Sequence, residues 1–266
     1  GNDFYRTFLD TSMTYSCARF LAPEETLEQA QINKLRGMIT KAQIGPEDHV
    51  LEIGCGWGSF AVEAVRQTGC RVTGITVSNA QMEWARERVR QEGMEDRIDI
   101  LLIDYRHITG QFNRIVSIEM LEAVGHSRLA TFFRCCGRLL KPGGLMALQT
   151  ITIPDERYDE YRRGTDWIRK HIFPGGHLPS QGAIRTAVAD GASLTIIETE
   201  EIGPHYAPTL REWRSRFLAQ IPALEAMGLG SAFRRKWVYY LASCEAAFAT
   251  GATGDLQIVL KRDSGG

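Results

Sequence analysis

A glycine-rich turn at residues 51–58, Leu-Glu-Ile-Gly-Cys-Gly-Trp-Gly, constrains the fold of this chain more than any other segment. It follows a short apolar stretch and precedes a helix-forming run, which predicts the turn that leaves the first strand of a parallel sheet. Because glycine tolerates positive φ and close approach of a ligand, Gly54 and Gly56 can present bare amides to a nucleotide-like cofactor. The glycine spacing is one residue shorter than in the dinucleotide fingerprint. A nucleotide-binding turn and an ordinary tight turn between strand and helix both fit this segment.

Apolar strands and amphipathic helices alternate from residue 59 to residue 153. We predict helices over 59–67, 82–91 and 129–140, and strands over 71–77, 98–104, 112–120 and 145–153. This rhythm predicts a doubly wound, mostly parallel sheet with right-handed crossovers, in which ligands bind beyond the carboxyl ends of the strands. The residues at or just inside those ends are Gly54, Thr76, Asp104, Glu119 and Gln149.

The pattern changes after Ile153. A polar and aromatic stretch over 154–173 is predicted to be helical and ends in a compact turn at 174–179. We then predict a strand over 194–202, helices near 209–227 and 231–250, and a last strand over 256–260. A strand that follows inserted helices indicates one α/β domain over residues 1–266, whose insertions at about 154–180 and 207–250 form a helical lid.

Composition excludes several classes of protein. The 266 residues carry a net charge of −1, so the chain has no global nucleic-acid signature, and we expect no nucleic-acid partner. No apolar run approaches the roughly 18 residues that span a bilayer. The six cysteines are too scattered for a disulfide scaffold or a zinc site, which favours a reducing cytoplasm and no metal. The chain begins at Gly1, inside a helix-forming segment, so we expect upstream residues to be missing.

Six blocks of sequence occur in an informative order. They are residues 15–17, 51–58, 74–81, 119–126, 172–180 and 204–206. Together they resemble the cyclopropane-fatty-acyl-phospholipid synthases and the mycolic acid cyclopropane synthases, which are class I S-adenosylmethionine-dependent methyltransferases. The resemblance covers residues 1 to about 261 and implies a Rossmann-like, seven-stranded sheet with an inserted helical lid. Larger members of the family carry an additional N-terminal domain, which we expect upstream of this chain.

The resemblance also implies a reaction. Members transfer a methylene group from S-adenosylmethionine to the cis double bond of an unsaturated phospholipid acyl chain, which yields a cyclopropane fatty acid and S-adenosylhomocysteine. An isolated alkene is a poor nucleophile, so the methyl group must be held in line and water excluded. Methyl attack leaves a carbocation, and a base must remove a proton from the transferred methyl. By resemblance, this base is a bound bicarbonate ion.

The resemblance assigns the bicarbonate pocket residue by residue. Its members are Cys17, Glu122, Gln149, Ile151 and Tyr206. Cys17 and Ile151 would contribute backbone groups, Tyr206 its hydroxyl, and Glu122 would orient the anion. Gln149 stands where the best-known members have histidine, and it donates a hydrogen bond but does not titrate near neutrality. Ala123 likewise replaces a common histidine.

Each of these residues has a purely structural alternative. Cys17 fits a small buried apolar residue, Tyr206 a packed aromatic ring, and Glu122 an acid near a helix N-terminus. The three histidines near these motifs sit beside turn signals, and we do not expect them to be catalytic. They are His126, His177 and His205.

The resemblance implies a larger set of cofactor-binding residues. They are Tyr15, Ser16, Gly54, Gly56, Thr76, Val77, Gln81, Asp104, Tyr105, Arg106 and Ile118. Many class I methyltransferases place an acid at the end of the second strand, where this chain has Thr76 and Val77. Asp104 would accept the adenine amino hydrogen and Tyr105 would cover the ring. The alternative for these last two is a solvated loop.

Aromatic rings alternate with cations over residues 157–173 and 233–240. Such a mixture suits the boundary between phospholipid head groups and acyl chains, so we expect a cytoplasmic enzyme that is peripheral on the inner membrane surface. Amphipathic lid helices that pack on the sheet explain the same pattern. The sequence leaves open a homodimer and the head-group preference.

Three rival functions remain. The first is methylation of the acyl chain to a methyl- or methylene-branched product, which Gln149 and Ala123 motivate. The second is a small-molecule N-methyltransferase of the plant alkaloid type, which would not need an anion pocket. The third is a non-catalytic protein that binds lipid or cofactor, which the retained Glu122 and the intact glycine turn disfavour.

Overall fold

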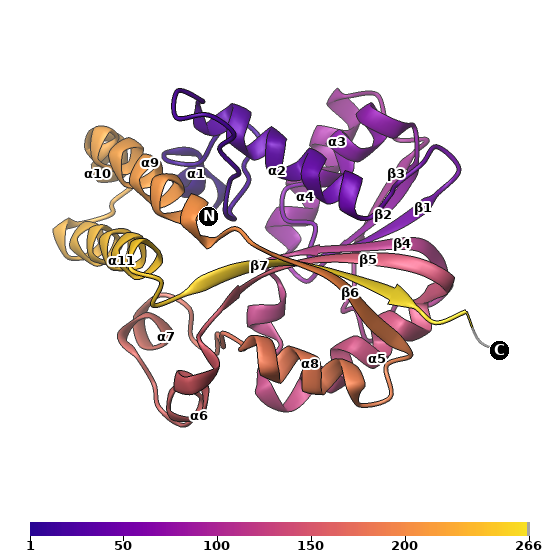
Figure 1. Cartoon of the computed structure of the whole chain (residues 1–266). Helices are drawn as coiled ribbons and strands as arrows, with labels where there is room; N and C mark the ends of the chain where they lie inside the picture. Colours follow the sequence, from indigo (N-terminus) through magenta and orange to yellow (C-terminus); the bar gives the residue numbers. More distant parts are fainter. Residues whose placement is uncertain (265–266) are drawn as a thin grey trace.

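The computed structural model describes residues 1–264 and contains one seven-stranded sheet with strand order β3-β2-β1-β4-β5-β7-β6 (Figure 1). The strands are β1 His49–Ile53, β2 Arg71–Thr76, β3 Ile98–Leu102, β4 Phe112–Ile118, β5 Leu140–Thr152, β6 Leu194–Glu201 and β7 Gly254–Arg262. The first five strands pair in parallel, and β7 runs antiparallel between β5 and β6. The predicted doubly wound and mostly parallel sheet is confirmed.

Helices cover both faces of this sheet (Figure 1). One face carries α2 Leu27–Lys41, α3 Ser59–Thr68 and α4 Asn79–Gln91, and the other carries α5 Leu129–Leu139 and α8 Gln181–Ala189. Neighbouring strand residues point to opposite faces, so Ile115 packs with α5 while Val116 packs with α2 and α3. Both faces of the central strands are therefore apolar, as expected for buried parallel strands.

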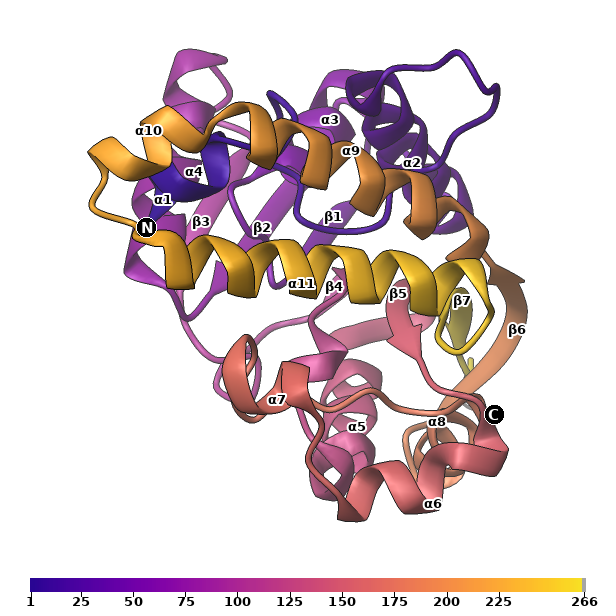
Figure 2. The same ribbon diagram turned by 90° about the vertical axis from the view of Figure 1, so that its left-hand side faces the viewer.

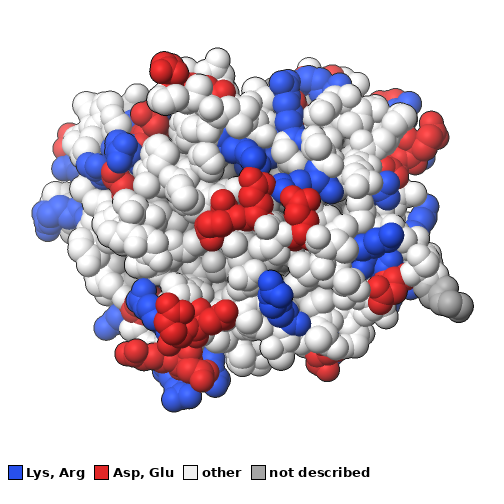
Figure 3. Space-filling view, in the orientation of Figure 1, with Lys and Arg blue, Asp and Glu red and all other residues white. Residues whose placement is uncertain are grey.

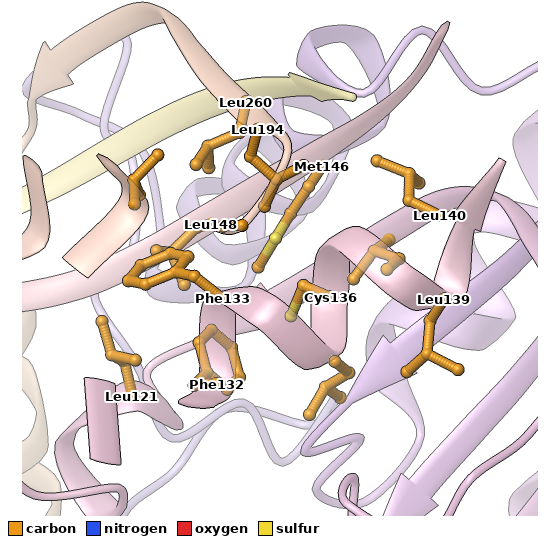
Figure 4. Packing of buried hydrophobic residues seen from close by; sticks show 14 of the residues in the cluster. Leu121, Phe132, Phe133, Cys136, Leu139, Leu140, Met146, Leu148, Leu194 and Leu260 are labelled. Atoms are coloured by element: carbon orange, nitrogen blue, oxygen red, sulfur yellow. The ribbon is translucent and has the colours of Figure 1, made fainter. Parts of the chain in front are cut away.

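The cluster beneath α5 shows how this packing is achieved (Figure 4). Phe132, Phe133 and Cys136 from α5 meet Met146 and Leu148 from β5, and all five are fully buried. Burial of one such side chain contributes roughly 1.5–3 kcal/mol relative to exposure. This core fixes the β5 strand, whose carboxyl end carries residues of the candidate site.

A third apolar cluster forms the lid at the carboxyl ends of the strands. The lid helices are α1 Asn2–Arg6, α6 Asp155–Arg163, α7 Trp167–His171, α9 Tyr206–Ala219, α10 Ile221–Ala226 and α11 Ser231–Ala249. Figure 2 shows α9 and α11 side by side, with α7 on the other side of α11. The N-terminal segment joins this cluster through Phe4, whose ring centroid lies 4.6 Å from that of Trp237. Short 3-10 helices span Leu121–Ala123 (η1), His126–Arg128 (η2) and Gly203–His205 (η3).

Several element boundaries differ from the sequence predictions, each for a local reason. The helix predicted near 209–227 is two helices, because Pro222 fits only the first turn of α10. The predicted helical stretch over 154–173 is likewise split into α6 and α7, with Gly164 ending the first. Strand β5 begins at Leu140, ahead of the prediction, and pairs with β4 across a register shift. Two helices, α2 and α8, were not predicted.

Gly137 allows α5 to approach the loop that precedes β6. A Cβ atom at this position would lie 1.8 Å from the Ala192 carbonyl oxygen. We predict that Gly137→Ala lowers the free energy of unfolding by about 1–3 kcal/mol, because overpacking displaces the backbone. Urea unfolding measures this change. Gly37→Ala, inside α2 with its nearest neighbour at 3.8 Å, is the control and should gain about 0.5–1 kcal/mol. Equal stability of the two variants would contradict the packing argument.

Candidate active site

Two cavities meet at the carboxyl ends of the strands. Their volumes are about 660 Å³ and about 210 Å³. Tyr15 and Glu119 line both cavities, so they stand where the two join. This is the edge at which doubly wound sheets bind ligands. The two cavities are therefore adjacent at Tyr15 and Glu119.

The smaller cavity is built on the glycine turn after β1. Gly54 and Gly56 have φ of +84° and +52°, a region that favours glycine. A Cβ at Gly54 would lie 2.7 Å from the Met120 side chain, so only glycine fits there. The predicted cofactor residues that line this cavity are Tyr15, Ser16, Gly54, Gly56, Gln81 and Ile118. The turn therefore leaves backbone exposed to a ligand, as the sequence indicated.

A buried acid, Glu52, and a buried base, Lys34, both line this smaller cavity. Lys34 donates to Ser16 Oγ at 2.5 Å, and burial lowers the pKa of Lys34. Burial raises the pKa of Glu52 to about 8, and its Oε2 atom is buried with no hydrogen-bond partner among the described residues. An ammonium group of a ligand would satisfy Glu52, and a carboxylate would suit Lys34. The pair thus fits a ligand with an amino-acid end.

The other predicted cofactor residues do not line either cavity. They are Thr76, Val77, Asp104, Tyr105 and Arg106. Thr76 is linked to the smaller cavity indirectly, because its hydroxyl donates to Gln81 at 2.9 Å. Asp104 pairs with Arg106 at 2.7 Å, which lowers the pKa of Asp104 to about 2, and Tyr105 packs edge-on against Phe132. Their contact with a cofactor stays a prediction.

Glu119 is the residue on which the predicted anion pocket converges. Its carboxylate accepts hydrogen bonds from the Cys17 amide at 2.8 Å, Gln149 Nε2 at 2.9 Å and the Tyr206 hydroxyl at 2.6 Å. These donors are three of the five residues assigned to bicarbonate from the sequence. The structure therefore places a carboxylate of the chain itself between them. The sequence analysis located Glu119 at the end of a strand but gave it no role.

The backbone of Glu119 has a φ of +50°, in the left-handed region that non-glycine residues seldom adopt. This conformation costs on the order of 1–2 kcal/mol. The three hydrogen bonds to the carboxylate offset this cost, because each charge-assisted bond is stronger than a neutral one. The strained backbone thus directs the side chain into the junction of the cavities.

Glu122 and Ile151 form a separate pair. Glu122 Oε1 accepts from the Ile151 amide at 2.5 Å and from the Thr150 hydroxyl at 3.0 Å, while its Oε2 is buried without a partner. Burial and the nearby Glu119 raise the pKa of Glu122 to about 8, so it is mostly neutral at pH 7. No hydrogen bond in the described part of the chain joins Glu122 or Ile151 to the other three residues. The five predicted residues fall into two hydrogen-bonded sets, although Glu122, Ile151 and Tyr206 all line the larger cavity with Glu119, and Thr150 was missed.

Two side chains of β7, Asp255 and Gln257, orient the side-chain amide of Gln149. Its Nε2 also donates to Asp255 Oδ2 at 3.1 Å, and its Oε1 accepts from Gln257 Nε2 at 3.0 Å. Burial, with Glu119 and Glu122 nearby, raises the pKa of Asp255 well above its usual value. These bonds fix the amide so that its donor faces Glu119. The sequence signal for these two side chains was the alternation of Asp255 and Gln257 with apolar residues in the last strand.

The larger cavity is bounded by the lid. Its apolar and aromatic lining comes from the end of β5, from α6 and α7 and the turn after them, from α9 and α11, and from the N-terminal segment. These residues are Tyr15, Ile151, Tyr161, Ile168, Ile172, Phe173, Leu178, Tyr206, Tyr240 and Phe248. Its volume falls within the range of pockets that enclose a small organic ligand. Apart from its acidic corner at Glu119 and Glu122, this cavity suits a long apolar molecule.

Neither a metal-binding cluster nor a membrane-spanning helix is found in residues 1–264. Residues 1–264 contain no group of three or more histidine, cysteine or acidic side chains that could hold a metal ion. Over the same residues, none of the helices combines the length and the apolar character that a bilayer crossing requires.

The sequence of the chain is similar to a protein family and to individual named proteins. A family model described as mycolic acid cyclopropane synthetase matches residues 1–258. The chain is 40% identical over 99% of its length to the tuberculostearic acid methyltransferase UfaA1 of Mycobacterium tuberculosis. It is 38% identical over 98% of its length to the cyclopropane-fatty-acyl-phospholipid synthase of Escherichia coli. It covers 63% and 65% of these two proteins, which is less than two thirds of each.

A solved structure agrees with this relationship. The mycolic acid cyclopropane synthase CmaA1, complexed with SAH and CTAB, matches with a TM-score of 0.90 and 32% sequence identity. The match covers 98% of this chain and 94% of the other. With the glycine turn, the strand order and the family model in agreement, the chain belongs to the mycolic acid cyclopropane synthetase family.

Proposed function

We propose that the chain transfers a one-carbon unit from S-adenosylmethionine to the cis double bond of an unsaturated phospholipid acyl chain. The observation that carries this proposal is the position of Glu119, which lines both the smaller cavity at the glycine turn and the larger, mostly apolar cavity. The family supports it, since the relatives named above are lipid methyltransferases and cyclopropane synthases. The chain spans only part of those relatives, so we propose residues 1–266 as the catalytic domain of a longer protein.

The residues of the smaller cavity fit S-adenosylmethionine. Gly56 leaves open space against the backbone, while Glu52 offers an unpartnered oxygen to the ammonium and Lys34 a donor to the carboxylate of its amino-acid end. When bound, this cofactor supplies an electrophilic methyl group, which the alkene attacks. Tyr15 and Glu119, which line both cavities, would contact that methyl.

Glu119 has the chemistry that the reaction needs. Attack by the alkene forms a carbon–carbon bond and leaves a cation on the acyl chain, and the carboxylate stabilises that charge. Oε1 accepts from Cys17 and Gln149 and Oε2 accepts from Tyr206, and the buried Asp255 carboxyl, whose pKa is raised well above its usual value, is a further hydrogen-bonding neighbour of Glu119. Glu119 is therefore the group that we propose takes a proton from the transferred methyl. The electron pair of the broken C–H bond then closes the ring.

In this proposal Glu119 takes the role that the sequence analysis gave to bicarbonate. Cys17, Gln149 and Tyr206 each direct a hydrogen-bond donor at the carboxylate, so an external anion would first have to displace it. A neutral Glu122 adds no second negative charge beside Glu119. An N-methyltransferase of a basic small molecule has no comparable need for a carboxylate held in this way.

A methylene-branched acyl chain is the second candidate product. If a hydride shifts onto the cationic carbon, the charge moves to the carbon that bears the new methyl. Loss of a methyl proton to Glu119 then gives a double bond instead of a ring. A base tethered to the chain in place of a mobile anion favours this candidate, as does the 40% identity to a tuberculostearic acid methyltransferase.

Exposed aromatic residues at and near the larger cavity support the proposed contact with lipid. Phe173, which lines it, is 39% exposed, and Tyr239 on α11 is 54% exposed and packs against Trp167. We propose that this end of the lid contacts the inner membrane surface, where acyl chains enter from phospholipids. The face in Figure 3 mixes both signs of charge, so attraction to anionic lipid would depend on local cations near the lid. A homodimer and a cytoplasmic location are further parts of this proposal.

Removal of the Glu119 carboxylate tests its role. We predict that Glu119→Gly lowers turnover by about 10²–10⁴-fold, the usual contribution of a general base. Glycine suits the φ of +50°, so the variant should fold, and it leaves an empty niche lined by three donors. Added bicarbonate should therefore restore much of the activity. Transfer of radiolabel from S-adenosylmethionine to dioleoyl phospholipid vesicles measures both effects.

Glu119→Gln is the matched control. Its amide fills the niche but does not act as a base, so it should be equally slow and should not respond to bicarbonate. The native chain should be indifferent to bicarbonate as well. Bicarbonate dependence of the native chain, together with full activity of Glu119→Gln, would reject Glu119 as the base.

Product identification tests the proposed function as a whole. We predict that the native chain converts an oleoyl group into a product that is heavier by one CH₂. Ring and methylene products are isomers, so proton NMR is needed: a cyclopropane gives strongly upfield signals, and an exocyclic methylene gives vinylic signals. No labelled lipid in any of several unsaturated phospholipids would refute the proposal.

The protonation of Glu122 predicts a pH effect on stability. Its pKa of about 8 in the folded state lies above that of an unfolded glutamate, about 4.3. The folded state thus binds this proton more tightly, and the resulting stability is present at low pH and is lost as pH rises from about 4.5 toward 8. We predict that Glu122→Gln has a smaller fall in urea midpoint between pH 5 and pH 8 than the native chain. Glu156→Gln, an exposed site, should match the native chain, and identical falls in all three would contradict a neutral Glu122.

A further inference from the structure

Three hydrogen-bonded side chains lead from the larger cavity to the surface. His177 lines the cavity, and its Nε2 lies 2.9 Å from the Tyr158 hydroxyl. That hydroxyl lies 2.8 Å from Nδ1 of His126, which is exposed. Tyr158 itself is only 7% exposed, so the path between the two histidines is buried. Neither the cofactor cavity nor the Glu119 contacts use these three residues.

A backbone hydrogen bond holds these three side chains beside Glu122, at the acidic corner of the larger cavity. The His177 amide donates to the Glu122 carbonyl at 2.8 Å, which ties the 174–179 turn to η1. Tyr158 comes from α6, and His126 begins η2, directly after η1. Glu122 lines the same cavity as His177 and keeps an unpartnered carboxyl oxygen. Three separate segments therefore meet beside a group that exchanges protons near neutrality.

The two buried members of the path are neutral. Burial, with the positive charges of His126, Arg169 and Arg162, lowers the pKa of His177 to about 4, and burial raises the pKa of Tyr158 to about 12. A neutral imidazole has one donor and one acceptor nitrogen, and a phenol hydroxyl donates and accepts. Nδ1 of His177 has no hydrogen bond within residues 1–264, so it is available to the cavity. Each member can thus receive a proton on one side and release one on the other.

We propose that His177, Tyr158 and His126 carry the proton released in each turnover from the closed cavity to solvent. This inference rests on the proposed function, because addition of a methyl group to an alkene followed by ring closure or a methylene double bond frees one proton. The proton leaves the Glu119 carboxyl and crosses the cavity that both residues line to reach His177 Nδ1, and His177 passes its Nε2 proton to the Tyr158 oxygen. Tyr158 gives its hydroxyl proton to His126 Nδ1, and His126 releases a proton to water. One proton enters and one leaves, with no change in oxidation state.

The three residues would act after the chemical step, and none of them contacts the reacting atoms. This agrees with the sequence analysis, which excluded His126 and His177 as catalytic bases. Their removal should therefore leave the first turnover intact and slow only the following ones, because the proton left in the cavity blocks regeneration of Glu119. A purely structural role would instead change the first turnover, the affinity for substrate or the stability.

Tyr158→Phe is the direct test, since it removes the hydroxyl and keeps the ring. Rapid-quench measurements with radiolabelled S-adenosylmethionine and dioleoyl phospholipid vesicles give the first turnover and the steady state separately. We expect an unchanged first turnover, a steady-state rate reduced by about tenfold or more, and an unchanged KM, with imidazole buffer restoring the rate. His126→Gln, at the exposed end, should show the same split without any risk to folding. His107→Gln removes an exposed histidine elsewhere and should leave both phases unchanged.

The outcomes separate this inference from the proposed function. If the native chain makes the lipid product but both variants keep the native ratio of first to later turnovers, the path is refuted and the function stands. Equal slowing of both phases, without imidazole rescue, also refutes the path. If the native chain makes no lipid product in the first turnover, the proposed function and the path fail together.

Discussion

The three hydrogen bonds to the carboxylate of Glu119 hold the active end of this molecule together. Their donors come from the N-terminal segment at Cys17, from β5 at Gln149 and from the start of α9 at Tyr206. These segments are far apart in the sequence, and one charged group binds all of them to the end of β4. Glu119 also lines both the smaller and the larger cavity. These hydrogen bonds thus add to the apolar packing that positions the lid relative to the sheet.

This arrangement gathers more acids than a buried site usually tolerates. Burial raises the pKa of Glu52, Glu122 and Asp255, so each of these carboxyls holds its proton more tightly than in water. Buried Lys34 lies close enough to several of them to oppose that effect. The protein therefore avoids several adjacent negative charges while it keeps acceptors and proton carriers beside the apolar cavity. A reaction that passes through a carbocation and releases a proton benefits from both features.

Local sequence signals predicted the sheet and many of its helices. The glycine turn and the apolar strands depend on neighbouring residues, and the structure retains them. Helices α2 and α8 were missed, although Thr26 and Ser180 cap them through their side chains. For the site, the sequence identified Cys17, Gln149 and Tyr206, but it assigned their donors to an external anion. It could not place Glu119 among them, because the direction of that side chain follows from a positive φ that the sequence does not reveal.

The sequence by itself determined the family, the order of strands and helices, and the edge of the sheet where chemistry takes place, because these depend on motifs and short-range periodicity. Only the tertiary structure decided which donors reach the Glu119 carboxylate, that the Ile151 amide donates to Glu122, and that the Tyr158 hydroxyl links His177 to His126. The physical reason is that hydrogen bonds between side chains from distant segments need angstrom-level placement. That placement is set by the packing of the lid against the sheet and not by any local pattern of residues.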